Sequence, residues 1–321
     1  MSMKLPTFSA AALAVLGAGL LPAADPQLLN LVMPDARIVA GVNVDQAKTS
    51  PFGLYILRQM QAQGAQHLQQ VASLTGFDPT RDVHELLIAS NGVPGQKTGL
   101  ILARGNFDAN RIQSAAVAGG GSTINYKGTT LLLDPKQVHA VAFPDATLAI
   151  AGDIASVEAA LDRQTAPAPP PAALLVQINQ WSGSEDAWGI ANLPFSALKP
   201  PATPSNPANA AVQNAFQNIQ QAAGGVKFGT QIVYTGQAQA DTPQNAASVA
   251  SVVQFLASMA QLQAQQKNPQ FASILTSLSV TASGNLVNLS LTLPEAQAEQ
   301  VFQIHPHATP QSIHRAPRRR P

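Results

Sequence analysis

Apolar residues recur along the chain in short runs separated by turn residues, a pattern typical of strands in an antiparallel sheet. Runs at 36–44, 85–90 and 98–104 predict strands in the first part of the chain. The segment 124–152 predicts three more, because turns containing Gly or Pro interrupt it. Further strands are predicted at 187–193, 226–240 and 278–293.

Helical periodicity occupies the segments between these runs, and capping residues mark where the helices begin. Ser50 followed by Pro51 predicts a helix start, and that helix extends to about Leu74. Asp108 and Asp153 are predicted to open two shorter helices. Further helices are predicted at 210–223, 243–267 and 295–304. In the helix at 243–267, the residues predicted to face the core are Val249, Val252, Val253, Leu256, Met259 and Ala260.

A proline-rich segment, 165–171, divides the chain into two parts with a similar order of elements. We predict an α+β protein with two related halves, each a mostly antiparallel sheet covered by helices. The N-terminal half is expected at 25–164 and the C-terminal half at 172–304, with a distant internal duplication as their origin. The segment 172–180 favours neither helix nor strand.

The two ends of the chain differ from its middle. Residues 1–24 are predicted to be a signal peptide: Lys4 precedes an uncharged run at 8–21, and small residues at 22–24 offer a cleavage site before Asp25. That run is short for a membrane span, which needs about 20 residues. Residues 305–321, rich in Pro, His and Arg, are predicted to form a disordered basic tail.

Charge and cysteine content exclude several classes of protein. Charged residues make up only 11% of the chain, and residues 25–304 hold 13 basic against 17 acidic residues. No broad basic face can form from that balance, which argues against a nucleic-acid partner. The absence of cysteine excludes disulfides, thiolate metal sites and a cysteine nucleophile. Together with the signal segment, it indicates a periplasmic or secreted bacterial protein.

Three stretches, 77–85, 126–163 and 226–293, carry a resemblance to a known group of proteins. The first has an Asp-Pro turn before a strand, and the second leads from a Tyr-Lys-Gly turn through two strands into a helix. The third combines a strand, an Ala-rich helix and a hairpin. This layout resembles an uncharacterised family of bacterial exported proteins with two tandem α+β halves. The resemblance covers roughly 34–302 and implies the fold and export; no activity or site residue transfers with it.

Few residues are candidates for a site. Trp181 and Trp188 flank two carboxylates and could stack on a sugar, although Trp188 alternates with Ile190 as a core residue would. His305 and His307 could bind a transition metal weakly, but their segment has no scaffold to hold a metal. No other metal ligands and no catalytic or cofactor-binding residues are predicted.

Two further groups are interpreted structurally. Asp78, Asp82 and Glu85 are expected to be a turn residue, a cap and a strand-edge residue, because a calcium loop needs a central glycine. The glycines at 119–121 lack the lysine of a phosphate loop and follow a helix, so we expect them to end it.

These observations favour an exported, non-enzymatic binding or envelope-associated protein over an enzyme. Two alternatives stay open: a carrier of small apolar ligands, and a hydrolase whose site is dispersed along the chain. No cofactor is expected. The partner is unknown, with an envelope protein or a polysaccharide as candidates. Membrane contact is expected only through residues 1–24, if they are not cleaved.

Deletion of 305–321 is expected to leave the melting temperature within about a degree of the full chain, since a tail without core residues makes few contacts. Thermal unfolding of the two chains measures this directly. A drop of many degrees would show that the tail docks on the protein.

Overall fold

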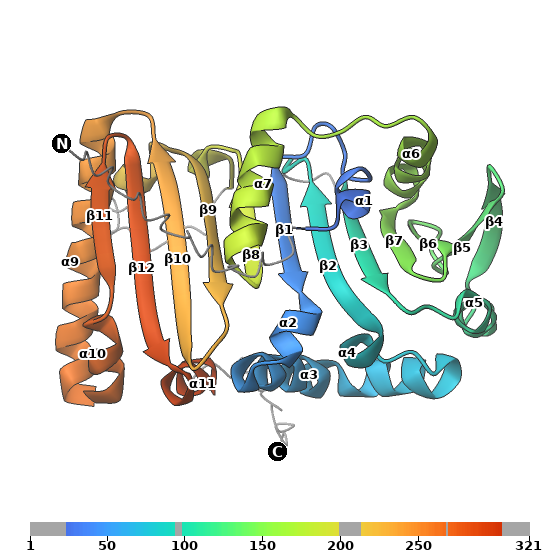
Figure 1. Cartoon of the computed structure of the whole chain (residues 1–321), viewed down its shortest axis with the longest axis horizontal. Helices are drawn as coiled ribbons and strands as arrows, with labels where there is room; N and C mark the ends of the chain where they lie inside the picture. The colour runs from blue at the N-terminus through green and yellow to red at the C-terminus, as the bar shows by residue number, and fades with distance from the viewer. Residues whose placement is uncertain (1–23, 94–97, 199–212, 268, 304–321) are drawn as a thin grey trace, which may run out of the picture.

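The computed structural model describes residues 24–93, 98–198, 213–267 and 269–303 (Figure 1). The predicted signal segment up to residue 23, the tail and its candidates His305 and His307 lie outside the described residues. The predicted α+β class is confirmed: antiparallel strands form one sheet with helices on both faces. Within the described part of the chain, no helix is both long and apolar enough to cross a membrane.

Twelve strands form the sheet, in the order β11-β12-β10-β9-β8-β1-β2-β3-β7-β6-β5-β4. In the first part of the chain they are β1 (Ile38–Asn43), β2 (Val83–Ser90), β3 (Gly99–Gly105), β4 (Ser122–Tyr126), β5 (Thr129–Leu133), β6 (His139–Asp145) and β7 (Leu148–Asp153). In the second part they are β8 (Ala187–Ala191), β9 (Ile219–Lys227), β10 (Gln231–Ala240), β11 (Ser279–Ser283) and β12 (Leu286–Pro294).

The strands of both parts are continuous through the antiparallel pair β1–β8 at the centre. Outward from that pair, the first three strands of each part follow in chain order. The last strand of each part comes next, β7 beside β3 and β12 beside β10. The strand that precedes it in the sequence, β6 or β11, lies beyond it. This matching order is what the predicted duplication requires, and the duplication itself stays a prediction.

The helices begin and end largely where local signals place them. In the first part they are α1 (Pro26–Leu29), α2 (Val44–Lys48), α3 (Pro51–Thr75), α4 (Pro79–Asp82), α5 (Ala109–Ala118) and α6 (Ile154–Thr165). In the second part they include α7 (Ala172–Ser184), the 3₁₀ turn η1 (Phe195–Leu198), α9 (Pro243–Lys267), α10 (Pro269–Leu275) and α11 (Glu295–Gln303). The predicted start of α3 is confirmed, because the Ser50 hydroxyl accepts the N–H of Gly53 at 2.9 Å. Asp108 and Asp153 cap α5 and α6 as predicted.

The core is shared between the two parts of the chain. On one face of the sheet, α1, α6 and α7 pack on strand residues such as Leu87, Leu102 and Ile150, all fully buried. On the opposite face, Phe52 of α3 packs with Ile232 of β10 in a cluster that also includes residues of α10 and α11. A helix from the first part therefore covers strands of the second part.

Three elements differ from their sequence predictions. The segment 124–152 was predicted to hold three strands, but the structure divides it among four, β4 to β7. The helix predicted at 210–223 is wrong over its last five residues, because β9 begins at Ile219 and runs through Gly224 and Gly225. Those glycines do not end a helix. A β-carbon on Gly225 would lie 2.4 Å from Cγ of Glu185, so the glycine permits a close approach between the start of β8 and β9.

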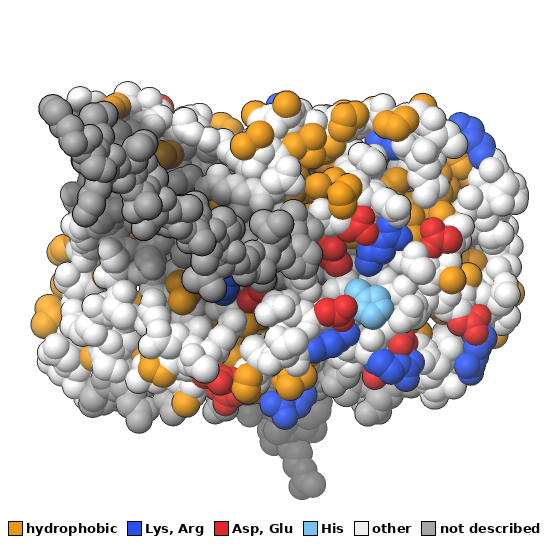
Figure 2. All heavy atoms as spheres, in the orientation of Figure 1, with side chains coloured by type: hydrophobic (Ala, Val, Ile, Leu, Met, Phe, Trp, Pro, Cys, Tyr) orange, Lys and Arg blue, Asp and Glu red, His pale blue; other side chains and the backbone are white. Residues whose placement is uncertain are grey.

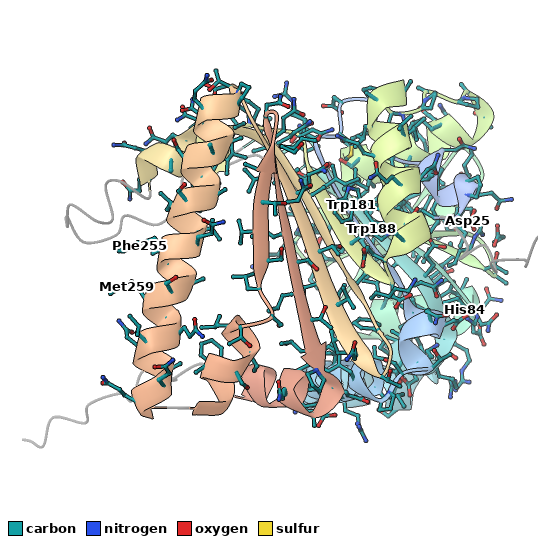
Figure 3. The ribbon with its side chains drawn as sticks, turned by 60° about the vertical axis from the view of Figure 1, so that its left-hand side comes forward. Asp25, His84, Trp181, Trp188, Phe255 and Met259 are labelled. Carbon is teal, nitrogen blue, oxygen red and sulfur yellow. The ribbon has the colours of Figure 1, made fainter. Side chains whose placement is uncertain are left out.

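Helix α9 follows its predicted inward face only near its start. Val249 is buried, whereas Leu256 and Met259 are 41% and 42% exposed. Figure 3 shows α9, marked by Phe255 and Met259, leaning away from the sheet toward its C-terminal end. Helix α10 packs against α9. The spacing of apolar residues predicted the helix α9 correctly, but it does not determine how far each turn of α9 lies from the sheet.

The central pair of strands is joined by an aromatic contact. Trp188 on β8 lies opposite Gly41 on β1 and is 7% exposed. A β-carbon on Gly41 would lie only 2.6 Å from the indole ring, so the ring packs directly on the glycine backbone. Gly189 is next to Trp188 on the other face, where a β-carbon would be 3.7 Å from its nearest neighbour.

Two carboxylates, Glu185 and Asp186, lie just before the start of β8. The side chain of Asp186 accepts the N–H of Phe228 at 2.6 Å, and its carbonyl accepts the N–H of Asn43 at 2.8 Å. Glu185, 8% exposed, accepts a hydrogen bond from the Thr235 hydroxyl at 2.7 Å through Oε1. Its Oε2 atom has no hydrogen-bond partner. Burial raises the pKa of the Glu185 carboxyl above its ordinary value.

Replacing Gly41 with Ala is expected to lower the free energy of unfolding by about 1–3 kcal/mol, because the new methyl group displaces the Trp188 indole. Gly189→Ala, on the same strand pair, is the matched control and should leave stability nearly unchanged. Urea unfolding of both variants measures the difference. Equal effects would show that the close contact with Trp188 is not what requires glycine.

Glu185→Gln is expected to raise the free energy of unfolding at pH 7 by about 1 kcal/mol, because the amide keeps the hydrogen bond from Thr235 and removes a buried negative charge. A raised pKa in the folded state means that stability is greatest when the carboxyl is protonated. Stability therefore falls as pH rises through the folded pKa, and the substitution should remove that decline. The same change at Glu158, on α6, serves as the control. A variant that keeps the wild-type pH dependence would contradict this assignment.

Candidate functional site

The tryptophans considered for sugar binding lie in the core. Trp181 and Trp188 are 8% and 7% exposed and belong to the cluster beneath α7. Of the two carboxylates between them, Glu185 accepts a hydrogen bond from the Thr235 hydroxyl, and Asp186 accepts one from the N–H of Phe228. This arrangement leaves little indole surface on which a sugar could stack.

The acidic residues near the start of β2 have separate structural tasks. Asp78 caps α4, accepting the N–H of Thr80 at 2.9 Å. Asp82 accepts two hydrogen bonds from Arg81, and Glu85 accepts the N–H of Asp25. Among the described residues, no group of three or more histidine or carboxylate side chains could hold a metal ion.

His84 is paired, which its sequence context did not indicate. Its Nδ1 atom lies 2.9 Å from Asp45 in α2, and its Nε2 atom lies 3.1 Å from the amide nitrogen of Asn106. Asp45 also receives a hydrogen bond from Lys48 at 3.2 Å. The group is exposed at the surface, where charged side chains gather on the right-hand half of the face in Figure 2.

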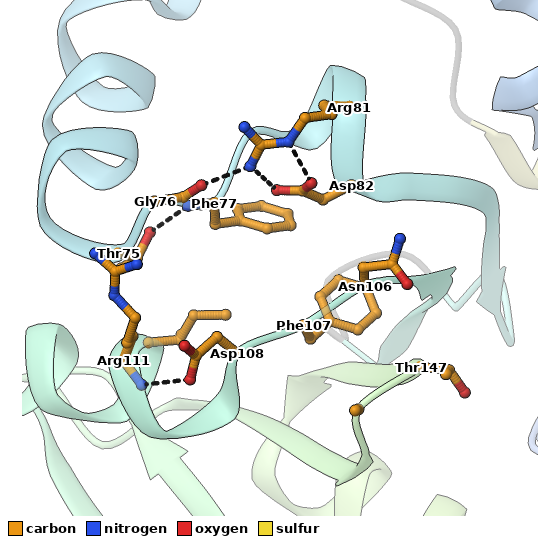
Figure 4. A pocket seen from close by; sticks show the side chains of 12 residues that line it. Thr75, Gly76, Phe77, Arg81, Asp82, Asn106, Phe107, Asp108, Arg111 and Thr147 are labelled. Atoms are coloured by element: carbon orange, nitrogen blue, oxygen red, sulfur yellow. Dashed lines mark hydrogen bonds and ion pairs between the residues drawn. The ribbon is translucent and has the colours of Figure 1, made fainter.

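The described residues form an open hollow of about 360 Å³ at the end of α3, which we call the α4–α5 hollow (Figure 4). Residues Thr75–Phe77, Arg81, Asp82, Asn106–Asp108, Arg111, Ile112, Ala146 and Thr147 line it. Two phenylalanines supply its apolar side: the rings of Phe77 and Phe107 are 5.8 Å apart. Phe107 in turn packs on Phe143 with ring centres 5.5 Å apart.

One of the two arginines in this hollow is neutralised. Arg81 binds Asp82 through two hydrogen bonds of 2.6 and 2.7 Å and the carbonyl of Gly76 at 2.7 Å (Figure 4). The hydrogen bonds from Arg81 lower the pKa of Asp82 despite the opposing effect of burial. The pair therefore stays ionised at neutral pH and contributes no net charge.

The second arginine is available to a ligand. The guanidinium of Arg111 lies beside Gly76, where a β-carbon would be 3.0 Å from Nη1. Gly76 ends α3 with a positive φ of 72°, so a glycine suits both the backbone and the neighbouring side chain. The Arg111 side chain has no hydrogen bond or ion pair with any described residue. Asp108 in the same lining carries the opposite charge, so the two arginines and two carboxylates of the hollow balance.

A second hollow lies on the other side of α5, also about 360 Å³, and we call it the α5–β5 hollow. Its lining is mostly apolar: Ile112, Ala116, Gly119, Gly121, Leu132, Leu133, Asp134, Pro135, His139 and Val141. The glycines that end α5 therefore border an apolar space. Ile112 lines both hollows and separates one from the other.

The weak packing of α5 explains why both hollows exist. None of its ten residues is buried. Besides Ile112 and Val117, its apolar residues are alanines, and Val117 is 48% exposed. Small side chains cannot fill the space between a helix and a sheet, so gaps remain on both sides of Ile112. The sequence signal was present as an alanine-rich helix with few large apolar residues, but it does not show which neighbours surround the gaps.

The comparisons with known proteins show a fold and no activity. No family model and no curated protein matches the chain. Two crystal forms of TP0453, a Treponema protein, resemble it. Form I has a TM-score of 0.50 at 10% identity, covering 88% of this chain and 98% of that chain. Form IV has a TM-score of 0.52 at 11% identity, covering 85% of this chain and 95% of that chain. The chain is therefore similar in fold to TP0453, at a sequence identity that carries no function.

Proposed function

We propose that the protein is an exported, non-enzymatic binding protein that holds a small, mostly apolar molecule beside α5. The observation that carries the proposal is the apolar α5–β5 hollow, next to a helix without a buried residue. Its volume of about 360 Å³ falls at the lower end of the range for small-molecule sites, about 300–1,000 Å³. A ligand there would cover the half-buried side chains of Ala116 and Val141.

A negatively charged group on the ligand would suit the α4–α5 hollow. Arg111 offers a guanidinium without a partner among the described residues, while Arg81 is already bound by Asp82. Ile112 borders both hollows, so a molecule with an apolar body and an acidic head would contact both sides of the same residue. A guanidinium can bind a carboxylate, sulfonate or phosphate through two parallel hydrogen bonds.

The hydrolase alternative is less well supported by the geometry. His84 and Asp45 form a pair, but the Nε2 atom of His84 faces Asn106, at 3.1 Å. Acyl transfer needs a nucleophile at that nitrogen. The buried carboxyl with a raised pKa, Glu185, lies against β9 and β10 and lines neither hollow.

Export forms the second part of the proposal. It rests on the pattern of residues 1–24 and on a chain of 321 residues without cysteine. A carrier or binding role in the envelope also suits a charge-poor surface. An envelope protein or a polysaccharide remains the partner class that we propose for delivery of the ligand.

Ala116→Trp tests the apolar hollow, because the indole would occupy it. The probe is 1-anilinonaphthalene-8-sulfonate, which combines apolar rings with an anion and becomes fluorescent in apolar sites. We expect its Kd to rise about tenfold or more, equivalent to the loss of about 1.4 kcal/mol of binding energy. Ala118→Trp, on the exposed face of the same helix, is the matched control and should leave the Kd unchanged. Equal affinities for both variants and the wild type would place the probe elsewhere.

Arg111→Gln tests whether Arg111 binds the negatively charged group of the ligand. An exposed ion pair contributes about 0.2–1 kcal/mol, so we expect the Kd of the same probe to rise about 1.5- to 5-fold. The loss should shrink as salt increases, since ions screen an exposed pair. Arg58→Gln, an exposed arginine of α3 away from the hollows, removes the same charge and controls for net charge. Equal losses in both variants would mean that general charge, and not Arg111, attracts the probe.

A further inference from the structure

The backbone nitrogen of Asp25 points at a carboxylate. The nitrogen lies 3.1 Å from Oε1 and 3.3 Å from Oε2 of Glu85 in β2, and its N–H donates to both. One amide hydrogen is thus shared between two oxygens, which gives neither a strong hydrogen bond. The preceding residue, Ala24, is 5% exposed and donates its own N–H to the Ser182 hydroxyl at 3.1 Å.

The charges around this nitrogen do not balance. Glu85 is paired across the sheet with Arg104 of β3, whose Nε atom binds the carboxylate of Asp25 at 2.5 Å. Arg104 also donates to the Thr147 hydroxyl at 3.1 Å, and to the side chain of Gln27. Two carboxylates therefore share one guanidinium, and Asp145 at the end of β6 faces the same arginine.

Burial makes this imbalance costly. It raises the pKa of Glu85 above its ordinary value, and the neighbouring carboxylate of Asp25 acts in the same direction. The N–H of Asp25 and the Arg104 guanidinium act in the opposite direction without reversing the shift. A further positive charge at the position of the Asp25 nitrogen would offset the cost.

We propose that cleavage between Ala24 and Asp25 creates an α-ammonium group on Asp25 that forms a salt bridge with the carboxylate of Glu85. In the cleavage, the peptide bond from Ala24 to Asp25 breaks. Water supplies a hydroxyl to the Ala24 carbonyl carbon and a proton to the Asp25 nitrogen, which takes a second proton from solvent. An ammonium group has three hydrogens, so it can donate to both oxygens of Glu85 at full strength.

The position and the timing of the cut follow from the contacts. Small residues at 22–24 suit a peptidase of the export machinery. A cut one residue earlier would put the charge on the nitrogen of Ala24, whose partner Ser182 is a neutral hydroxyl. Because Ala24 is buried in the folded protein, the bond must be cut before this segment docks. The new terminus then seats itself as the protein folds.

The salt bridge predicts a particular pH dependence. An α-amino group ordinarily has a pKa of about 7.7–8.0, and pairing with Glu85 raises it in the folded state. The stabilisation is then fully present below the ordinary value and is lost as pH rises through the raised value. The charged groups that face the ammonium are Glu85, the side chain of Asp25 and Arg104.

The test compares the chain that begins at Asp25 with the same chain acetylated on the Asp25 nitrogen, which keeps one N–H but removes the charge. Each is made with Glu85 and with Glu85→Gln, and unfolding in urea is followed at pH 7. We expect acetylation to raise the unfolding equilibrium constant about tenfold or more in the Glu85 chain, as loss of a charged hydrogen bond does. In the Glu85→Gln chain the change should be less than about twofold. Equal stability of free and acetylated Glu85 chains overturns the proposal.

Two further measurements keep the proposal testable if Glu85→Gln fails to fold. The advantage of the free amine in the Glu85 chain should disappear about two pH units above its ordinary pKa, and an advantage that persists there overturns the salt bridge. Mass spectrometry of the exported protein should give Asp25 as the first residue, and a first residue of Met1 or Ala24 overturns the cleavage. The inference rests on the proposed export and is independent of the ligand at α5. The recombinant chains test the salt bridge between the Asp25 ammonium and Glu85, and the exported protein tests cleavage between Ala24 and Asp25.

Discussion

The pairing of β1 with β8 is the constraint on which the rest of the structure depends. It makes one sheet from strands of both parts of the chain, and the indole of Trp188 packs on the bare backbone of Gly41 at that point. Once the two strands are joined, helices from either part can cover strands of the other. Phe52 of α3 reaches Ile232 of β10, and α7, which packs on β8 and β9, shares one core cluster with Val39 of β1 and Leu87 of β2. The shared core follows from the shared sheet, since each helix needs an apolar face to cover.

Packing is uneven across this long sheet, and the unevenness accounts for the proposed binding region. Large aliphatic side chains fill the centre, where Leu87, Leu102 and Ile150 are inaccessible to solvent. Toward one edge, α5 supplies mainly alanines and leaves two hollows on either side of Ile112. Toward the other edge, α9 leans away and exposes Phe255 and Met259 (Figure 3). Gaps persist where small side chains face a sheet, because alanines are too short to fill the space between a helix and the sheet.

Charge is scarce in this protein, so the places where it gathers carry information. Charged side chains at the surface near β2 form matched pairs, such as Arg81 with Asp82 and Lys48 with Asp45. Two sites near these pairs bear on function. The Arg111 guanidinium lies in the lining of the α4–α5 hollow, and the carboxylates of Glu85 and Asp25 share Arg104. The first supports a ligand with an acidic group, and the second supports a free amino terminus at Asp25.

The sequence by itself determined the features that depend on neighbouring residues. Caps at Ser50, Asp108 and Asp153 placed helix starts correctly, and apolar runs bounded by turns identified β1, β2 and β3 but gave three strands where β4 to β7 are four. Capping and turn formation need only a few adjacent residues, so their signals are complete in the sequence. The α+β class followed from the same local evidence.

Only the tertiary structure decided how far elements lie from one another. Gly225 looked like the end of a helix, but it is a strand residue because it pairs with Trp188 of β8 and Thr235 of β10. Met259 had the spacing of a core residue, yet α9 leans away from the sheet there. The hollows beside α5, the partners of His84 and the contact of Asp25 with Glu85 join residues far apart in the sequence. Such contacts depend on distances across the sheet, which local patterns do not encode.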